Sequence, residues 1–367
     1  MTALLHAISK HSSDFSGDMR TALRNVVRLA RTHRRVPRVK TSDEQSTCAS
    51  IYFLTPDYPK PAGGVRVIYR HVDILNEAGL NALVLHQKPK FRCDWFENET
   101  RIAAVSNVTV RRGDLLVVPE LDVAVLSRLP KGVRYAIFNQ NAHLTWQRPS
   151  NSDSYAATNP DFAGVITVSE HNFEMLGYAY PGCRIERVHL SIDSDIFYPG
   201  DASRPRQIAY MPRRGRDDAT QVLEMLRARG ILEGWHIAAL DNLSHRQVAD
   251  ELRRSRIFLA FTHQEGFGLP AAEAMACGCY VIGNHGFGGG EFFRPEFSTP
   301  VNVGDVLHFA QAVEKIIAVE NRTEGWCTEK GDLASKSITQ TYSQTRERDD
   351  VLRLFCDFMQ ANGGVST

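Results

Sequence analysis

The chain has 367 residues, with 43 Lys and Arg against 42 Asp and Glu. This length suits two domains with separate cores, and the balanced charge favours neither nucleic acid nor an acidic partner. The seven cysteines are scattered, and no apolar run approaches the ~20 residues of a membrane-spanning helix, so we expect a cytoplasmic protein with reduced thiols.

The first forty residues are strongly basic. On a helix, one narrow stripe would carry Arg20, Arg24, Arg28, Arg31 and Arg35, opposite leucine, valine and alanine. Such a basic amphipathic helix can lie on an anionic membrane surface, and we expect peripheral association with the inner membrane face through residues 17–40. The alternative is a helix packed on the catalytic body. The polar run 41–47 predicts a linker, which closes a leader of residues 1–47.

From residue 48 onward, short apolar runs alternate with helical patterns. This alternation predicts α/β architecture, with parallel sheets covered by helices on both faces. The strand candidates are residues 51–54, 82–86, 115–118, 135–138, 165–168 and 185–189 in the first half, and 208–211, 235–240, 257–261 and 280–283 in the second. Two such units in tandem predict Rossmann-like domains at 48–198 and 199–339, with ligands at the carboxyl ends of the strands.

The first predicted strand is followed by a Pro-rich loop and then by Gly63 and Gly64, which open a helical pattern. Paired glycines let the backbone approach a phosphate or a sugar closely. This pair is not a G-x-G-x-x-G fingerprint, so dinucleotide binding gains no support. After the strand 135–138, polar side chains from Asn139 to His143 form a hydrogen-bonding edge.

In the second half, an arginine cluster follows the strand 208–211. Its members are Arg213, Arg214 and Arg216. Arginines at a strand end can neutralise a diphosphate by bidentate hydrogen bonds, although a solvated basic turn is the plain alternative. The next strand is followed by Asn242 and Leu243.

The most informative stretch is residues 264–278, which read as a glycine-rich loop and a helix between two strands. Glu265 and Glu273 lie eight positions apart, and Pro270 suits the first helical position. The loop N–H groups and the positive end of the helix dipole then favour an anion. Two carboxylates beside an anion site suit a nucleotide-sugar; the plain alternative is a turn before an ordinary buried helix. A second glycine-rich turn ends with Gly289 and Glu291.

This string resembles the Glu-x7-Glu motif of retaining GT-B glycosyltransferases, the large family 4 group that uses nucleotide-sugars. The resemblance extends over residues 50–360. It includes the strand that ends in Val-Ser-Glu at 168–170 and the hinge segment 189–199, where Leu190-Ser191 replaces the usual Asn-Gly. It implies a GT-B fold with two Rossmann-like domains facing a central cleft, the first of them completed by a C-terminal helix within 340–367.

The resemblance also implies roles for single residues. The catalytic set that it implies is Glu265, Arg213, Arg214 and His143, with Gln140 or Asn141 as alternatives to His143. The donor-binding set is Gly63, Gly64, Asn141, Arg216, Asn242, Leu243, Gly266, Phe267, Gly268, Leu269, Glu273, Gly289 and Glu291. In the family the first glutamate of the motif contacts sugar hydroxyls and the second contacts the ribose.

The implied activity is retaining transfer of a hexosyl or deoxyhexosyl group from a nucleotide-sugar to a glycan or lipid-linked acceptor in surface polysaccharide biosynthesis. No metal or other cofactor is expected, because arginines and amides can stabilise the leaving diphosphate. The run Asp193-Ser-Asp195 matches the metal motif of GT-A enzymes only superficially, since it lies at a domain junction. The alternatives are a nucleotide-sugar epimerase and a non-catalytic glycan-binding protein of the same fold.

Overall fold

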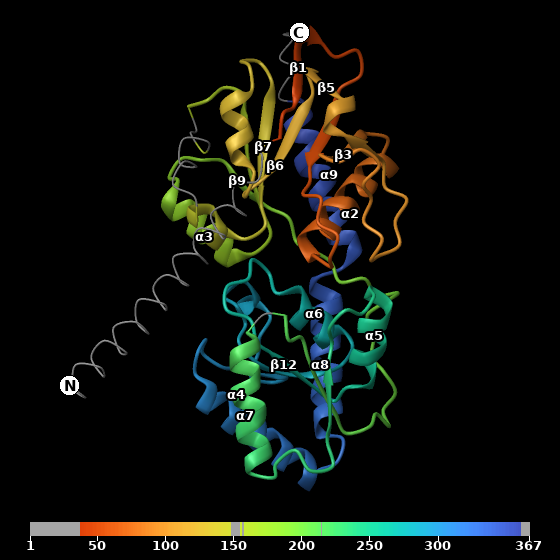
Figure 1. The fold of residues 1–367 in the computed structure, drawn as a ribbon, viewed down its shortest axis with the longest axis vertical. Coiled ribbons are helices and arrows are strands. Elements are labelled where there is room, and N and C mark those ends of the chain that lie inside the picture. Colours follow the sequence, from red (N-terminus) through yellow and green to blue (C-terminus); the bar gives the residue numbers. More distant parts are fainter. Residues whose placement is uncertain (1–36, 148–154, 156–157, 214, 361–367) are drawn as a thin grey trace, which may run out of the picture. The chain divides into compact units, whose positions relative to one another are not determined.

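The computed structural model describes residues 37–147, 155, 158–213 and 215–360. The part from Val39 onward forms one compact unit, and the fold described below belongs to it (Figure 1). The basic leader predicted within residues 1–36, and Arg214 of the predicted site, lie outside the described residues.

The first sheet has seven parallel strands in the order β4-β3-β2-β6-β7-β8-β9. Their bounds are Ser50–Leu54 (β2), Asn81–His86 (β3), Ile102–Ala104 (β4), Leu115–Pro119 (β6), Arg134–Asn139 (β7), Phe162–Thr167 (β8) and Ile185–Arg187 (β9). All six predicted strands of this half are present. The sequence prediction missed β4, which is only three residues long.

The second sheet has five parallel strands in the order β11-β10-β12-β13-β14. Their bounds are Gln207–Tyr210 (β10), His236–Ala239 (β11), Ile257–Ala260 (β12), Tyr280–Gly283 (β13) and Ser298–Pro300 (β14). The four predicted strands of this half are confirmed, and β14 was not predicted.

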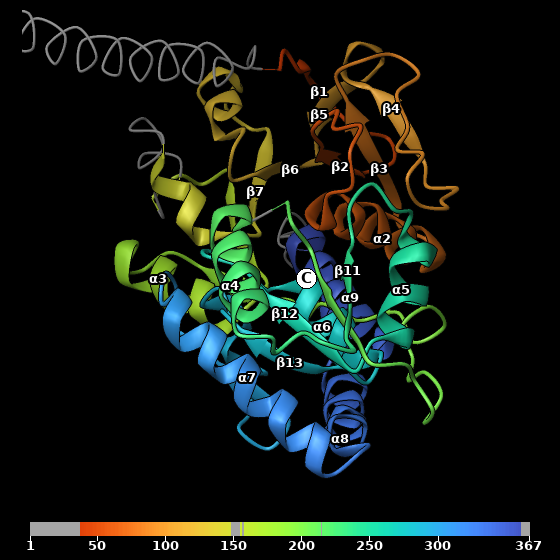
Figure 2. The ribbon, with the colours of Figure 1, turned by 60° about the horizontal axis from the view of Figure 1, so that its bottom comes forward.

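Helices cover both faces of the second sheet, as Figures 1 and 2 show. They are α4 (Arg216–Ala228), α5 (His245–Arg254), α6 (Leu269–Ala276), α7 (Val306–Arg322) and α8 (Trp326–Thr341). Successive strand side chains point to opposite faces. Ile257 and Leu259 of β12 therefore pack in the core with α4 and α7, whereas Phe258 and Ala260 pack in the core with α5, α6 and α8.

The predicted linker at 41–47 is wrong over most of its length. Lys40–Gln45 forms strand β1, which pairs in parallel with β5 (Thr109–Arg112) in a separate two-stranded sheet. The side chains of β1 are mostly exposed and polar, so no apolar alternation marks it as a strand. Pairing with β5 holds this segment as a strand, although its side-chain pattern does not predict one.

In the first domain, α2 (Gly63–Glu77) follows β2, and its apolar residues Val65, Ile68, Val72 and Leu75 are buried. The final helix α9 (Gln344–Gln360) packs on α2 and on the first sheet, where the Phe355 and Phe53 ring centroids are 5.3 Å apart. The shorter elements of the described chain are η1 (Val105–Asn107), η2 (Val123–Arg128), η3 (Ala142–Gln147), α3 (Glu170–Ala179), β9 and η5 (Gly288–Glu291). Within the described ranges, no helix has the length and apolar character required to cross a bilayer.

Candidate active site

The loop between β12 and α6 presents free backbone donors. Gly268 precedes the helix with a φ of 95°, a left-handed conformation that glycine adopts without steric cost. The helix begins at Leu269, so Pro270 is its second residue and not its first. Among the described residues, the N–H groups of 266–269 have no hydrogen-bond acceptor. These donors, with the helix dipole behind them, suit an anion.

Loops of the first sheet contact this loop directly. A Cβ built on Gly63 would lie 2.7 Å from Leu269 Cδ1, and one built on Gly266 would overlap the backbone carbonyl oxygen of Gln140. The Gln140 side chain donates to the carbonyl of Gly64 at 3.0 Å, and Asn141 donates to the carbonyl of Gln264 at 3.1 Å. The glycine pair, the polar edge and the Glu-x7-Glu loop therefore meet.

Replacing Gly266 by alanine should destabilise this contact. The added methyl would clash with the backbone of Gln140, which cannot rotate away as a side chain can. The clash is removed only if the two loops move apart. We expect the free energy of unfolding to fall by about 1–3 kcal/mol, measured by urea denaturation. Gly177→Ala is the matched control, because that helical glycine has open space around its Cβ position. Equal stability of the two variants would show that the contact between the loops is absent in solution.

Glu265 is held by the turn that follows β13. Its N–H donates to the carbonyl of Gly286 at 2.8 Å, and its backbone forms an isolated parallel bridge with Phe287. Its side chain is half-buried. The backbone of Glu265, which follows β12, is therefore held in place by the turn that follows β13.

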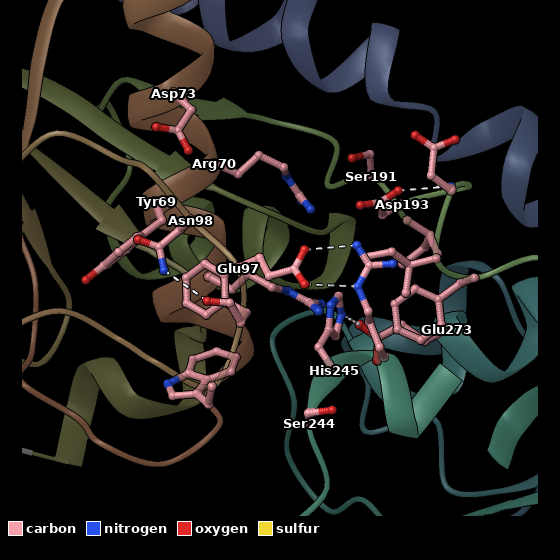
Figure 3. A pocket seen from close by; sticks show the side chains of 18 of the residues that line it. Tyr69, Arg70, Asp73, Glu97, Asn98, Ser191, Asp193, Ser244, His245 and Glu273 are labelled. Atoms are coloured by element: carbon pink, nitrogen blue, oxygen red, sulfur yellow. Dashed lines mark hydrogen bonds and ion pairs between the residues drawn. The ribbon is translucent and has the colours of Figure 1, made fainter. Parts of the chain in front are cut away.

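Glu273 lies inside a cavity of about 590 Å³. Its carboxylate, in a residue that is 5% exposed, forms an ion pair with Arg66 of α2 and lies 3.7 Å from His245 Nε2. The other cavity walls include Arg70, Trp95 and the hinge residue Asp193. Figure 3 shows Arg70, Asp193, His245 and Glu273 around this space. Glu265 does not line this cavity, so the two glutamates serve different parts of the site.

His245 is a neutral neighbour of Glu273. Burial lowers the pKa of its imidazole, and the cations Arg66, Arg70 and Arg246 lower it further, to about 3. Near neutral pH the ring therefore adds no charge to a region that already contains three arginines. Arg66 Nε and His245 Nε2 are buried without hydrogen-bond partners among the described residues.

Of the predicted arginines, Arg213 donates to the backbone carbonyl of Pro61, two residues before Gly63. Arg216 is exposed at the start of α4. Asn242 is also exposed and has a φ of 56°. Leu243 is half-buried and packs on the same core cluster as Leu269. The structure therefore brings Arg213 next to the loops described above, whereas Arg216 and Asn242 are exposed.

His143 and the second glycine-rich turn lie together. His143 Nε2 is 3.2 Å from His171 Nε2, and burial lowers the pKa of His143, with a further contribution from His171. The N–H of Gly289 in that turn donates to the carbonyl of His285 at 3.0 Å. The ring centroids of His143 and Phe287 are 5.4 Å apart, which places His143 against the turn that also holds Glu265.

Glu291 has its partners in three other elements. Its carboxylate forms an ion pair with Arg187, accepts the hydroxyl of Tyr342 at 2.8 Å and accepts the N–H of Glu170 at 3.0 Å. It therefore ties the second glycine-rich turn to the first domain. Its predicted contact with the donor stays a prediction.

Four functional candidates were missed by the sequence analysis: Arg66, Glu120, His245 and Phe287. Arg66 lies three residues after Gly63, and a cation in the first turn behind a glycine pair is a signal that could have identified it. Glu120 directly follows β6. Burial raises the pKa of Glu120 to about 7, even though it accepts the N–H of Gln140 at 3.4 Å. His245 and Phe287 carry no comparable signal.

No group of three or more His, Cys, Asp or Glu side chains in the described ranges is arranged to hold a metal ion. The predicted absence of a cofactor stays a prediction.

Residues 223–329 match the model of the family described as glycosyl transferases group 1. An alpha-1,6-glucosyltransferase of Actinobacillus pleuropneumoniae serotype 7 (strain AP76) is 23% identical over 336 residues, which cover 85% of this chain and 96% of the relative.

Solved structures share the fold at low sequence identity. Sucrose-phosphate synthase from Thermosynechococcus elongatus gives a TM-score of 0.65 at 16% identity, covering 85% of this chain and all of that one. Anabaena Alr3699/HepE in complex with UDP gives 0.61 at 12% identity, covering 84% and 100% of the two chains, and its complex with UDP-glucose gives 0.60 at 12%.

The predicted GT-B fold is confirmed by these structural matches and by the two parallel sheets. The group 1 match falls on the domain that carries both glutamates of the motif. The chain thus has the GT-B fold and resembles the group 1 glycosyl transferases, and these matches support a glycosyltransferase.

Proposed function

We propose that this protein is a retaining glycosyltransferase that moves a hexosyl or deoxyhexosyl group from a nucleotide-sugar to a glycan or lipid-linked acceptor in surface polysaccharide biosynthesis. One observation carries the proposal. The unpaired N–H groups of 266–269 lie between Glu265 and Glu273, and the loops of the first sheet close over them. An anion with hydroxyl-bearing groups on both sides matches that arrangement.

In the proposed reaction, the acceptor oxygen forms a bond to the anomeric carbon while the bond from that carbon to the diphosphate oxygen breaks. The departing phosphate accepts the acceptor's proton, so both partners lie on one face of the sugar and the configuration is retained. The amides of 266–269 and Arg213 stabilise the charge that grows on the diphosphate. Glu265 accepts hydrogen bonds from the sugar hydroxyls, and Glu273 accepts them from the ribose.

This scheme requires no metal, because the amides and Arg213 supply the electrostatic stabilisation that a cation would give. The neighbour that binds UDP and UDP-glucose supports a nucleoside diphosphate sugar as donor. We also propose a cytoplasmic location with peripheral attachment to the inner membrane face through residues 17–40, which would bring the site to a lipid-linked acceptor.

A thermal-shift panel tests the donor class. A ligand that binds only the folded state stabilises it by about 2.7 kcal/mol at a concentration 100 times its dissociation constant. We expect UDP, GDP or dTDP, and the corresponding sugars, to raise the melting temperature, and NAD to leave it unchanged. A shift with NAD that equals the nucleoside diphosphate shift would contradict the proposal.

A further inference from the structure

Phe287 is an exposed aromatic residue in a strained backbone conformation. Its φ of 69° and ψ of −61° belong to a rare turn geometry that glycine adopts far more easily than a bulky residue. Its side chain is 43% exposed, so core packing does not explain its presence. Strain of this kind persists where the surroundings hold it, and it is concentrated at ligand-binding and catalytic positions.

The backbone of Phe287 is fixed beside Glu265. The two residues form a parallel bridge, and the next N–H, that of Gly288, donates to the carbonyl of Glu265 at 3.3 Å. The N–H of Phe287 itself donates to His285 Nδ1 at 3.0 Å. The ring therefore projects from a turn that cannot move independently of the proposed sugar-binding carboxylate.

Imidazole rings from both domains surround this phenyl ring. His171 of α3 stacks on it, with 5.2 Å between centroids and 21° between planes, and the His143 centroid is 5.4 Å away. His285 meets it edge-on at 6.0 Å. Burial lowers the pKa of all three imidazoles, so the rings are neutral near pH 7. Together they form an uncharged aromatic surface that is partly open to solvent.

The strand order gives the position of this surface relative to the proposed donor site. Neighbouring strands in the order β11, β10, β12 and β13 end near Asn242, Arg213, Glu265 and Phe287 respectively. The residues proposed to bind the donor therefore run along this edge of the sheet from Asn242, through Arg213 at the diphosphate, to Glu265 at the sugar. Phe287 follows the sugar position on the side away from the nucleotide.

We propose that Phe287, His143 and His171 form a stacking platform for a sugar ring of the acceptor. The proposal rests on the proposed function, because glycosyl transfer to a glycan requires a second saccharide beside the donor sugar. One face of a pyranose ring carries C–H groups, and this face gains free energy by leaving water for an aromatic surface. The imidazole nitrogens can then hydrogen-bond the equatorial hydroxyls, and the acceptor oxygen lies beside Glu265.

Saturation-transfer NMR on the full chain tests this platform. The probes are the methyl glycosides of glucose, galactose, mannose and N-acetylglucosamine, each with UDP, GDP or dTDP present. We expect the wild type and Phe287→Tyr to transfer saturation to the ring C–H protons of at least one glycoside. Phe287→Gly should bind that glycoside about tenfold more weakly, with its nucleotide affinity changed less than twofold. Tyr178→Ala is the control, since that residue is 92% exposed on α3.

The outcomes separate the platform from the proposed function. Equal transfer in the wild type and in Phe287→Gly, or no transfer from the wild type to any glycoside while a nucleotide is bound, would overturn the platform. Failure of the wild type to bind any of the three nucleotides would overturn the proposed function. Melting temperature gives a further check. Glycine adopts this backbone conformation without strain, so Phe287→Gly should be at least as stable as the wild type. A large loss of stability would show that the ring serves packing and not ligand binding.

Discussion

Replacing Glu265 by alanine is expected to lower the rate of glycosyl transfer about 100- to 1000-fold, the usual cost of removing one preorganised hydrogen-bonding group from a reacting centre. The backbone of this residue is fixed by Gly286 and Phe287, so its carboxylate would meet the sugar hydroxyls of the proposed donor with little reorganisation. The measurement is the initial rate of nucleoside diphosphate release with donor and acceptor present.

The same variant should retain its affinity for the free nucleoside diphosphate within about threefold, because the proposed contact is to the sugar and not to the nucleotide. Glu265→Gln keeps the shape of the side chain and loses its charge, so its transfer rate should fall between those of the wild type and Glu265→Ala. Glu296→Ala is a matched control, since it removes an exposed carboxylate from the same domain. Turnover by Glu265→Ala at the wild-type rate would show that Glu265 has no role in the reaction.

The largest loss of stability is expected from Glu347→Ala. This carboxylate is fully buried and contacts Arg70 Nε at 2.6 Å, His71 Nε2 at 3.1 Å and the hydroxyl of Ser191 at 2.6 Å. Removing this carboxylate leaves the half-buried Arg70 guanidinium, His71 and the Ser191 hydroxyl without their shared partner, and breaking such a pair costs about 3–5 kcal/mol of unfolding free energy. Asp349→Ala is the control, because Asp349 is an exposed carboxylate on the same helix.

The contribution of Glu347 should also depend on pH in a defined direction. Burial alone would raise the pKa of this carboxyl, but Arg70 and His71 more than offset burial and lower the pKa to about 2. A lowered folded-state pKa means that the stabilisation is complete above the unfolded value of 4.5 and disappears as the pH falls toward 2. Urea unfolding at neutral pH and at about pH 3 measures this change. If the difference in unfolding free energy between the wild type and Glu347→Ala stays constant over this pH range, the predicted pH dependence is wrong.

Long apolar strands were predictable from the sequence because burial on both faces of a parallel sheet leaves continuous apolar runs. The strands β1, β4, β5 and β14 lack that signal, since they are short or exposed at their side chains. The meeting of Gly64, Asn141 and Gly266 was also predictable. Carboxyl ends of parallel strands share one edge of each sheet, and the two edges face each other in this fold.

Other contacts at the site depend on how the two domains dock, which no local pattern records. Arg66 and Glu273 are separated by 207 positions in the sequence and form an ion pair only because α2 lies against the start of α5 and α6. Phe287 likewise reads as an ordinary residue in a glycine-rich turn. Its strained backbone and its three imidazole neighbours are visible only once His143 and His171 have been placed by the first sheet.

The position of α9 has a consequence for biosynthesis. The core of the first domain begins at β2, yet Phe355 and Glu347 complete it from the far end of the chain. A nascent chain can therefore finish the second domain while the first still exposes the surface that α9 will cover. Domains usually mature in the order of their translation. Here the domain translated first is sealed last, and ribosome-bound intermediates will present Phe53 to chaperones until residues 344–360 emerge.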